Sequence, residues 1–402
     1  MADPRRPAGH PLRLAQLIET LDMGGAENLA VQIANAFASL HTSHLYVMTR
    51  PGPLSGRVDT DVHAHYLHYD RAPIGQPWHF LPSVVKGYQL LAHRIRQDGI
   101  EIIQTHLPGA NFWGLLLAMR KQCKVVATVH NNAEFLYGDS DDPIRARLRR
   151  TAYRQILKRC QATVAVSEQV SRSLLQTLSL PDVAGKRLYA VPNGVTVPDP
   201  LPAHRRLAAR RRHLSDPALP FLLAAGRLIE QKNFAILVTA AGILRDRGLD
   251  FQLVVVGEGP LRADLELQVM QLQLGDLVRL PGNLDNLSEL MQSADLFVLP
   301  SLWEGLPLVL LEAMARALPV VGSRIHGIAE VIESGVNGVL VEPGDAQALA
   351  AALADLLPVP ERRQELGQAG LATVRRDYDF QQTLARLEQL YLHLRERKPS
   401  DS

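Results

Sequence analysis

The sequence has few cysteines and no long apolar run. Two cysteines, Cys123 and Cys160, occur in 402 residues, too few for the disulfide framework of a small secreted domain. No apolar stretch approaches the ~20 residues that a membrane-spanning helix needs. The polar, proline-rich start of the chain also lacks a signal-like apolar segment. These absences predict a cytoplasmic protein that crosses no membrane, and they leave open its attachment to the inner face of one.

The chain also has no large excess of positive or negative charge. Lys and Arg number 43 against 41 Asp and Glu, a net charge of +2, which argues against nucleic acid as a partner. The turn Gly24-Gly25-Ala26-Glu27 lies where a phosphate-binding loop would lie. It lacks the G-x-G-x-x-G pattern, and no ribose-binding acid follows near position 50. A nicotinamide-dependent oxidoreductase is therefore disfavoured.

What the chain does have is two similar halves in which apolar strands alternate with helical segments. The first half opens with a strand at 12–18, the glycine turn and a helix at 28–40, and it ends at the turn Pro192-Asn193-Gly194. The second half repeats the alternation after a proline-rich connector. This pattern is typical of doubly wound α/β domains with parallel sheets. We predict a Rossmann-like domain over 1–198, a second one over 199–378, and a terminal helix within 379–402.

One stretch of the second half carries the clearest signs of a site. The apolar run 295–300 predicts a buried strand, and Pro307 predicts the first turn of the helix after it. Glu304 then lies in the turn at the carboxyl end of the strand, and Glu312 about two turns along the helix. Because a helix start offers unpaired N–H groups and a positive dipole end, an anion fits between these carboxylates. Such a site suits a phosphorylated polyol.

Two further strand ends are polar. Arg227 and Lys232 follow the first strand of the second half, where two cations beside a helix start can neutralise a diphosphate. Arg and Lys in such positions are more often solvated surface charges than ligand-binding residues. His130 ends a strand of the first half beside Asn131; a lone histidine is more often structural, but this polar strand end favours a site. The Asp-x-Asp within 139–142 follows no apolar strand, so we interpret it as a solvated loop.

A basic segment lies in the first half. Residues 144–160 carry seven Lys and Arg around an apolar residue at every fourth position: Ile144, Leu148, Ala152, Ile156 and Cys160. A helix with this pattern is able to lie on an anionic membrane surface, at ~1 kcal/mol for each cation near it. An ordinary surface helix gives the same pattern, so both interpretations stay open.

Taken together, the motifs resemble the family 4 retaining glycosyltransferases of the GT-B fold. The matching pieces are Gly24-Gly25-Ala26-Glu27, His130, Pro192-Asn193-Gly194, Gly226-Arg227 with Lys232-Asn233, Gly257-Glu258-Gly259-Pro260, and Glu304 with Glu312, the family's Glu-x7-Glu. The resemblance implies two Rossmann-like domains with parallel sheets that face a cleft, and a terminal helix that crosses back to the first domain. It also implies a nucleotide-diphosphate sugar as the donor, with UDP-sugar favoured over GDP-sugar, and neither a cofactor nor a metal.

The resemblance further implies roles for single residues. Arg227 and Lys232 would bind the diphosphate, Glu304 the hydroxyls of the donor sugar, and Glu312 the ribose. The expected catalytic residues are Arg227, Lys232, Glu304 and His130; the expected donor-binding residues are Gly24, Gly25, Gly226, Gly305, Leu306, Pro307, Leu308 and Glu312; and Glu27 and Asn131 are expected on the acceptor side. One departure is His326-Gly327 ahead of Glu330, where the family often has Gly-Gly.

The predicted function is retaining transfer of a sugar to a glycan or lipid-linked acceptor in envelope or extracellular polysaccharide biosynthesis. Two cations and helix N-termini can stabilise the leaving diphosphate. Front-face attack is favoured over a covalent intermediate, because Glu304, the one obvious nucleophile, is expected at the sugar hydroxyls. Two alternatives remain: a sugar-nucleotide epimerase, which would turn over the donor without an acceptor, and a non-catalytic nucleotide-sugar-binding protein. The pattern specifies neither the sugar nor the oligomeric state.

Overall fold

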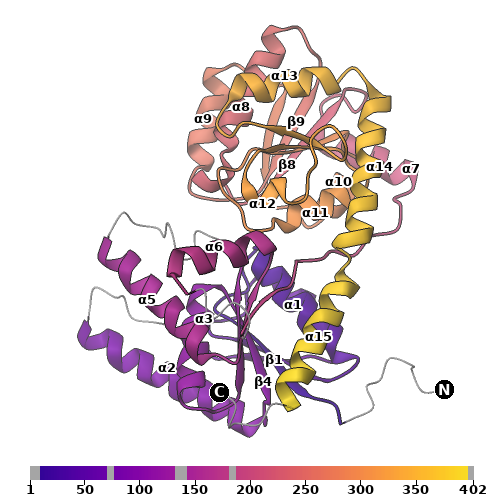
Figure 1. Ribbon diagram of the computed structural model, residues 1–402. Helices are drawn as coiled ribbons and strands as arrows, with labels where there is room; N and C mark the ends of the chain where they lie inside the picture. Colours follow the sequence, from indigo (N-terminus) through magenta and orange to yellow (C-terminus); the bar gives the residue numbers. More distant parts are fainter. Residues whose placement is uncertain (1–9, 70–76, 132–142, 181–186, 397–402) are drawn as a thin grey trace, which may run out of the picture. The chain divides into compact units, whose positions relative to one another are not determined.

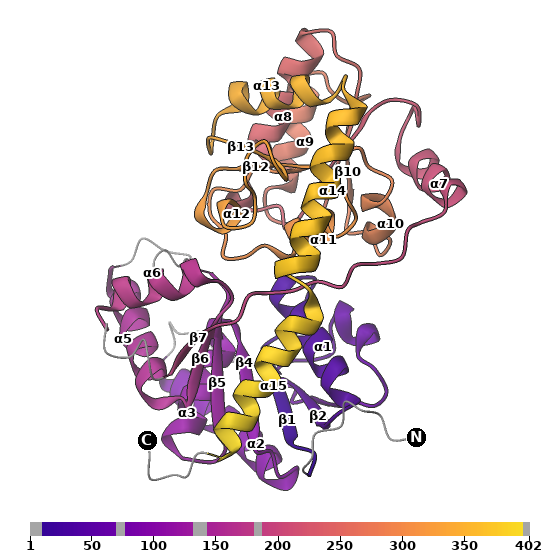
Figure 2. The ribbon, with the colours of Figure 1, turned by 45° about the vertical axis from the view of Figure 1, so that its right-hand side comes forward.

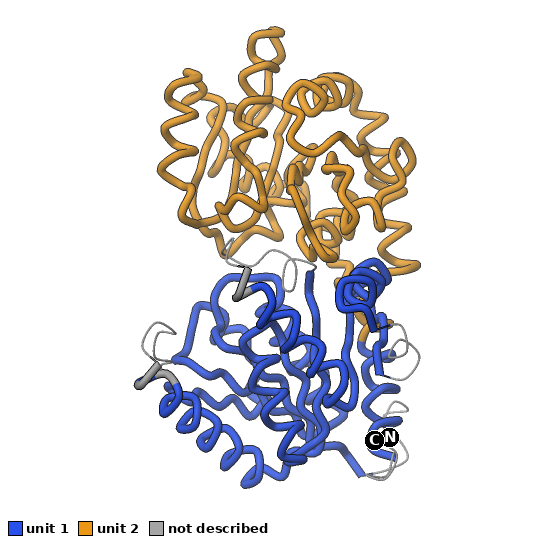
Figure 3. The backbone as a smooth tube through the Cα atoms, turned by 60° about the vertical axis from the view of Figure 1, so that its left-hand side comes forward, with its two compact units in different colours: residues 1–192, 384–402 blue, residues 193–383 orange. Residues whose placement is uncertain are grey.

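The computed structural model describes residues 10–69, 77–131, 143–180 and 187–396. The chain forms two compact units, which Figure 3 shows in different colours. Unit 1 contains residues 1–192 and 384–402, and unit 2 contains residues 193–383. The chain therefore enters unit 2 within the Pro192-Asn193-Gly194 turn and returns to unit 1 within its last helix, whereas the sequence placed these changes after residues 198 and 378.

Unit 1 is built on a seven-stranded sheet whose strands are all parallel. In sheet order the strands are β3 (His63–Tyr66), β2 (Thr42–Val47), β1 (Arg13–Ile18), β4 (Ile102–His106), β5 (Lys124–Val129), β6 (Ala162–Ala165) and β7 (Leu188–Ala190). The strand order reverses between β1 and β4. In doubly wound sheets ligands bind at the carboxyl ends of the strands near such a reversal.

Helices cover both faces of this sheet. They are α1 (Gly25–Ala38), α2 (Pro77–Gln97), α3 (Leu107–Met119), α5 (Pro143–Arg159), α6 (Glu168–Leu178) and α15 (Phe380–Glu396), with a short 3-10 helix η1 (Pro53–Arg57). Helices α1 and α15 lie on one face, and α2, α3 and α5 on the other (Figures 1 and 2).

The terminal helix α15 is packed into unit 1. The ring of its Tyr391 lies 5.5 Å, between centroids, from the ring of Phe37 in α1. At the end of α15 the Lys124 ammonium donates to two of the last carbonyl oxygens, including that of Arg395 at 3.0 Å. A lysine there satisfies carbonyls that have no partner within the helix and suits the negative end of its dipole.

Unit 2 holds a six-stranded parallel sheet. Its strands, in sheet order, are β10 (Val278–Gly282), β9 (Gln252–Val256), β8 (Phe221–Ala225), β11 (Leu296–Leu299), β12 (Val320–Ser323) and β13 (Val339–Val341). Its helices are α7 (Ala203–His213), η3 (Glu230–Lys232), α8 (Phe234–Asp246), α9 (Arg262–Gln271), α10 (Leu287–Met291), α11 (Leu308–Met314), α12 (His326–Ala329), α13 (Ala346–Leu356) and α14 (Pro360–Asp377). Strands β8, β9 and β11 are buried on both faces, as parallel strands between helical layers are.

The predicted α/β architecture of two parallel-sheet, Rossmann-like domains is confirmed. The apolar runs form the strands where the sequence placed them, and an apolar cluster of unit 2 joins α8, α9 and α13 to β8 and β9. Because the strands of each sheet are parallel, all their carboxyl ends lie at one edge. The polar residues that follow β5, β8 and β11 therefore lie at the ligand-binding edges of their own sheets.

Candidate functional site

At the carboxyl edge of the unit 2 sheet, glycines let the loops after β8 and β9 meet. The Gly226 N–H donates to the Val256 carbonyl at 2.9 Å. A Cβ atom on Gly257 would lie 1.9 Å from the Gly226 carbonyl oxygen, and Gly257 has a φ of 143°. A side chain there would push the two loops apart. The Gly-x-Gly of the sequence thus serves the close approach of two backbones.

Lys232 and Glu304 form a buried ion pair at this edge. Lys232 Nζ lies 2.5 Å from Glu304 Oε1, and the two side chains are 14% and 7% exposed. Ser301 Oγ donates to the same oxygen at 2.8 Å, and Gln231 Nε2 donates to Oε2 at 3.2 Å. Three donors therefore compensate for the burial of this carboxylate. The sequence predicted both residues at one site but not their pairing with each other.

Arg227 stays outside this pair. Its side chain is exposed, and within the described parts of the chain its guanidinium has no ion-pair or hydrogen-bond partner. Lys232 instead runs past Gly226, where a Cβ atom would meet Lys232 Cε at 3.2 Å. Asn233 occupies the N-cap of α8 in a left-handed conformation with φ of 50°, and its side chain makes no capping bond. The two cations of the predicted phosphate site thus differ: one is paired and buried, and one is exposed.

The segment after Glu304 leads directly into α11. Pro307 is the N-cap of α11 rather than part of its first turn, because its ψ of 115° is extended, so the helix begins one residue later than predicted. Asn193 Nδ2 donates to the Leu306 carbonyl at 3.2 Å and thereby holds the loop. The side chains of Leu306 and Leu308 are buried, so the groups that this loop can offer a ligand are main-chain atoms.

Glu312 lies in the second turn of α11, as predicted, and is half-buried. Burial lowers the pKa of the Arg316 guanidinium, and the Glu312 carboxylate opposes that shift, which places the two charges near each other. Gly305 is approached by the start of α12: a Cβ atom on Gly327 would lie 2.2 Å from the Gly305 carbonyl oxygen. At positions 326–327 this chain has His-Gly where the family often has Gly-Gly. The close contact requires only the second of the two glycines, and this chain has it.

In unit 1, the glycine turn lies at the start of α1. Gly24 is the N-cap and Gly25 the first helical residue, and no side chain caps this end. A Cβ atom on Gly24 would lie 2.1 Å from Glu27 Oε2, so the Glu27 carboxylate folds back over the turn. Helix α1 has 14 residues, and its first N–H groups point at this turn. The sequence placed these residues in a turn before a helix at 28–40, so the helix begins three residues earlier than predicted. Their approach to phosphates stays a prediction.

His130 lies at the carboxyl end of β5 and contacts a second histidine that the sequence analysis did not consider. Its Nε2 lies 3.2 Å from Nδ1 of His106, which ends β4 and is fully buried. His106 Nε2 lies 2.8 Å from Gln16 Oε1 on β1. Burial lowers the pKa of His130 to about 4, so its ring is neutral at physiological pH. Asn131 follows, half-buried, and ends this described part of the chain.

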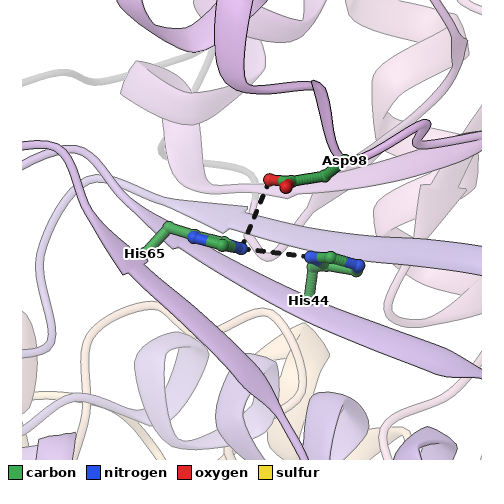
Figure 4. Close-up of side chains that lie close together, drawn as sticks. All are labelled: His44, His65 and Asp98. Carbon is green, nitrogen blue, oxygen red and sulfur yellow. Dashed lines mark hydrogen bonds and ion pairs between the residues drawn. The ribbon is translucent and has the colours of Figure 1, made fainter. Parts of the chain in front are cut away.

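A different histidine group lies at the other end of the unit 1 sheet. Figure 4 shows His65 of β3 between His44 of β2 and Asp98, which follows α2. His65 Nε2 lies 3.1 Å from His44 Nδ1 and 3.4 Å from Asp98 Oδ2. Among the described residues this group is the one whose ligand atoms lie within 4.8 Å of one another, close enough to consider a metal ion.

The surroundings of His65 argue against a built metal centre. Arg94 Nε and Nη2 lie 3.3 and 3.1 Å from His65 Nδ1, and Arg94 Nε lies 3.1 Å from Asp98 Oδ2. Because a guanidinium only donates, Nδ1 must accept and the ring proton must sit on Nε2, the atom that a metal would need. The group is therefore a hydrogen-bonded ion cluster. The Asp-x-Asp segment at 139–142 lies outside the described residues.

The basic segment forms α5, and its predicted apolar stripe is buried at Ile156 and Cys160 but not at Leu148. Leu148 is 65% exposed, so the every-fourth-residue apolar stripe is wrong at that position. Tyr153, Ile156 and Leu157 are the side chains that pack inward, with spacings of three and four residues. The exposed face carries cations one helical turn apart: Arg147, Arg150, Arg154 and Lys158.

Comparisons with known proteins define the class. The family model "Glycosyl transferases group 1" matches residues 206–373, and "Glycosyltransferase Family 4" matches residues 23–197. The structure of Anabaena HepE in complex with UDP and glucose superposes with a TM-score of 0.77 at 19% identity, over 94% of this chain and 99% of that one. The two units thus have the fold of GT-B glycosyltransferases.

Two curated relatives narrow the class to a family. The D-inositol 3-phosphate glycosyltransferase of Pseudarthrobacter chlorophenolicus is 30% identical over 297 residues, 72% of this chain and 70% of the relative. The amylovoran biosynthesis glycosyltransferase AmsK of Erwinia amylovora is 40% identical over 153 residues, 34% of this chain and 38% of the relative, so the match spans about two fifths of AmsK. The chain belongs to the group 1, family 4 glycosyltransferases. Within the described residues, no helix is both long and apolar enough to span a membrane.

Proposed function

We propose that this chain transfers a sugar, with retention, from a nucleotide-diphosphate sugar to a glycan or lipid-linked acceptor in envelope or extracellular polysaccharide biosynthesis. UDP-sugar is the favoured donor and GDP-sugar the second. The observation that carries the proposal is the buried Lys232–Glu304 pair at the carboxyl edge of the unit 2 sheet. The names of AmsK and of the UDP-bound HepE support the pathway and the nucleotide.

In the proposed mechanism, unit 2 acts mainly by electrostatic stabilisation of the leaving group. Negative charge develops on the diphosphate as the bond to the anomeric carbon breaks, and Lys232 and Arg227 stabilise it together with main-chain N–H groups at the start of α11. We propose that these groups replace a metal ion, so activity should survive chelation. Lys232 leaves Glu304 when the diphosphate arrives, and Glu304 then accepts hydrogen bonds from sugar hydroxyls.

The same contacts favour front-face attack. Both Glu304 oxygens already accept hydrogen bonds from Ser301, Gln231 and Lys232, which lowers their nucleophilicity. We therefore propose that the leaving phosphate accepts the proton of the acceptor hydroxyl, rather than that Glu304 forms a covalent intermediate.

A donor panel tests the function. The enzyme is incubated with UDP-, GDP- and ADP-sugars, with and without a lipid or glycan acceptor fraction, in EDTA and in Mg²⁺. Melting temperature is recorded beside product, since a bound nucleotide raises it by mass action. Transfer that needs the acceptor supports the proposal. Conversion of the sugar without an acceptor would identify an epimerase, and binding without turnover a non-catalytic protein.

We further propose that the basic face of α5 brings the enzyme to the anionic inner surface of the cell membrane. Arg147, Arg150, Arg154 and Lys158 lie on one exposed face, and the exposed Leu148 lies beside them. At ~1 kcal/mol per cation near the surface, reversing three charges should reduce binding by more than about 100-fold. Co-sedimentation of an Arg147→Glu, Arg150→Glu, Lys158→Glu variant with anionic vesicles tests this, with neutral vesicles as the control. Unchanged co-sedimentation refutes the membrane proposal.

A further inference from the structure

The loop after β11 is held against η3 by one residue, Gln231. Its main-chain carbonyl accepts the Leu302 N–H at 2.8 Å. Its side-chain Nε2 donates to the Trp303 carbonyl at 2.9 Å and to Glu304 Oε2 at 3.2 Å. Because both partners of Nε2 only accept, the NH₂ group of the amide must face them, which fixes the orientation of the amide. Three consecutive residues of the loop are therefore bonded to one residue of η3.

A second neutral donor reaches the same carboxylate from within the loop. Ser301 is fully buried, and its Oγ donates to Glu304 Oε1 at 2.8 Å. Lys232 Nζ lies 2.5 Å from that same oxygen. Within the described parts of the chain, Oε1 thus has one neutral donor and one charged donor, whereas Oε2 has one neutral donor.

The three donors differ in how they respond to a diphosphate. A lysine ammonium is a point charge on a flexible four-carbon stem, so Lys232 is able to turn towards an anion. The Ser301 hydroxyl and the Gln231 amide are neutral, so an anion attracts them less. In the proposed function Lys232 leaves Glu304, whose side chain is only 7% exposed. A buried carboxylate without any donor is costly, and these two neutral donors leave one on each of its oxygens.

We infer that Ser301 and Gln231 are positioning residues that hold the Glu304 carboxylate in place while Lys232 exchanges it for the diphosphate. The inference rests on the proposed function, because it explains how the exchange occurs in a buried site. Each oxygen of Glu304 keeps one donor and has a lone pair left for a sugar hydroxyl. Ser301 and Gln231 act through Glu304, so their effect on the nucleotide has to disappear when the charge of Glu304 is removed.

Nucleotide binding tests this dependence on Glu304. Ser301→Ala leaves Oε1 with Lys232 as its one donor, so Lys232 is released less readily. We expect the affinity for UDP, measured by calorimetry, to fall about 10-fold, the value of one hydrogen bond to a charged group. In a Glu304→Gln background the same substitution should change the affinity less than about 2-fold. An equal loss in both backgrounds, or no loss in the parent enzyme, overturns the inference.

Two further variants accompany this test. Ser293→Ala is the matched control, because Ser293 is 4% exposed and its hydroxyl donates to a main-chain carbonyl, that of Glu289 at 2.7 Å. UDP affinity should stay the same in this variant, and a loss equal to that of Ser301→Ala would contradict the inference. Gln231→Met keeps the length of the side chain and loses its amide. It should behave as Ser301→Ala does in both backgrounds.

An experiment without nucleotide decides the inference even if UDP does not bind. The midpoint of urea unfolding is measured for Lys232→Met, Ser301→Ala and the double variant. Once Lys232 is absent, Ser301 is one of two donors left to a buried carboxylate. We therefore expect Ser301→Ala to lower the midpoint more in the Lys232→Met background than in the parent enzyme.

The unfolding result separates this inference from the proposed function. Equal midpoint shifts in the two backgrounds would show that Ser301 and Lys232 act independently, and the inference would be wrong. Failure of sugar transfer would refute the proposed function and leave the unfolding result unaffected. The two hypotheses can therefore fail separately.

Discussion

The carboxyl edges of the two sheets bury different kinds of polar group. In unit 2 the buried groups are charged: Lys232 and Glu304 lie 2.5 Å apart with further donors around the carboxylate. In unit 1 they are neutral: His130, His106 and Gln16 share hydrogen bonds and carry no net charge. A buried ion pair costs desolvation and can be exchanged for another ion, whereas a neutral row fixes the direction of its bonds.

We propose that this difference decides which edge takes the diphosphate. A cation that is already paired with a carboxylate can change its partner for a diphosphate, which is a stronger anion. In the proposed function, the charged edge of unit 2 therefore takes the diphosphate and, through Glu304 and Glu312, the sugar and ribose hydroxyls.

Removing the cation of unit 2 should have the largest effect. Lys232→Ala takes away one stabilising group for the leaving diphosphate, and we expect kcat to fall about 1000-fold. It also leaves Glu304, which is 7% exposed, without its counter-ion, at a cost of about 3–5 kcal/mol in unfolding free energy. Steady-state kinetics, calorimetric binding of the nucleoside diphosphate and denaturant unfolding measure the three effects.

A surface ion pair provides the matched control. Arg324 and Glu342 lie 3.0 Å apart with 50% and 68% of their side chains exposed. Such pairs contribute about 0–1 kcal/mol, so Arg324→Ala should leave turnover and stability nearly unchanged. Near-normal kinetics of Lys232→Ala would show that Lys232 does not bind the diphosphate.

Glu304→Gln tests whether the ion pair is exchanged. The variant keeps the shape of the side chain and frees Lys232 from a negative neighbour. We expect a turnover loss of about 10- to 100-fold, the value of a charged hydrogen bond to the sugar, while affinity for the free nucleoside diphosphate is equal or higher. A loss of nucleotide affinity instead would show that Glu304 supports the phosphate site rather than the sugar. A pH–rate profile that follows the titration of Glu304 would instead show that Glu304 acts as a general acid, a general base or a nucleophile.

The sequence predicted one of these edges better than the other. In unit 2 the strand ends, glycines and charged residues follow one another closely, so Lys232 and Glu304 were assigned to one site although 72 residues separate them. Their pairing was not predicted, because spacing along the chain does not say which way a side chain points. The shift of the α11 start past Pro307 has the same cause, since proline is compatible with both the N-cap and the first turn.

In unit 1 the informative residues have no pattern in the sequence. Gln16, His106 and Tyr391 come from three distant segments, and no spacing in the sequence connects them. The strand register and the packing of α15 bring them together. The one signal available was the polarity of Gln104, Thr105 and His106 inside a strand that is otherwise apolar. The inward face of α5 was predicted in part: Ile156 and Cys160 are buried as the stripe implied, whereas Leu148 is exposed and Tyr153 and Leu157 were not included.

Acidification should weaken unit 1 more than unit 2. Burial lowers the pKa of His44 and of His130 to about 4 from 6.5. The unfolded chain therefore binds protons first as the pH falls, so this stability is complete above pH 6.5 and is lost between pH 6.5 and 4. The loss amounts to about 3 kcal/mol for each of these groups. His41, His65 and His106 shift in the same direction, against His213 alone among the described histidines of unit 2.

Amide hydrogen exchange of the whole enzyme at pH 7 and pH 4.5, corrected for the intrinsic pH dependence of exchange, measures both units in one sample. Protection should fall in β2, β4 and β5 and persist in β8 and β9. An equal loss in both sheets would contradict the contrast between a neutral and a charged edge.

The smallest expected effect concerns the second carboxylate of unit 2. Glu312 is half-buried on α11 beside Arg316, outside the Lys232–Glu304 pair, so its substitution leaves that pair intact. If it binds the ribose hydroxyls, it does so equally in the ground and transition states, and Glu312→Gln should raise the donor KM about 10-fold with little change in kcat. A deoxyribose donor provides the control, since the variant and the parent enzyme should then differ less. A fall in kcat at unchanged KM would instead mean that Glu312 acts on the reacting end of the donor, and that the charged edge is not divided between sugar and ribose.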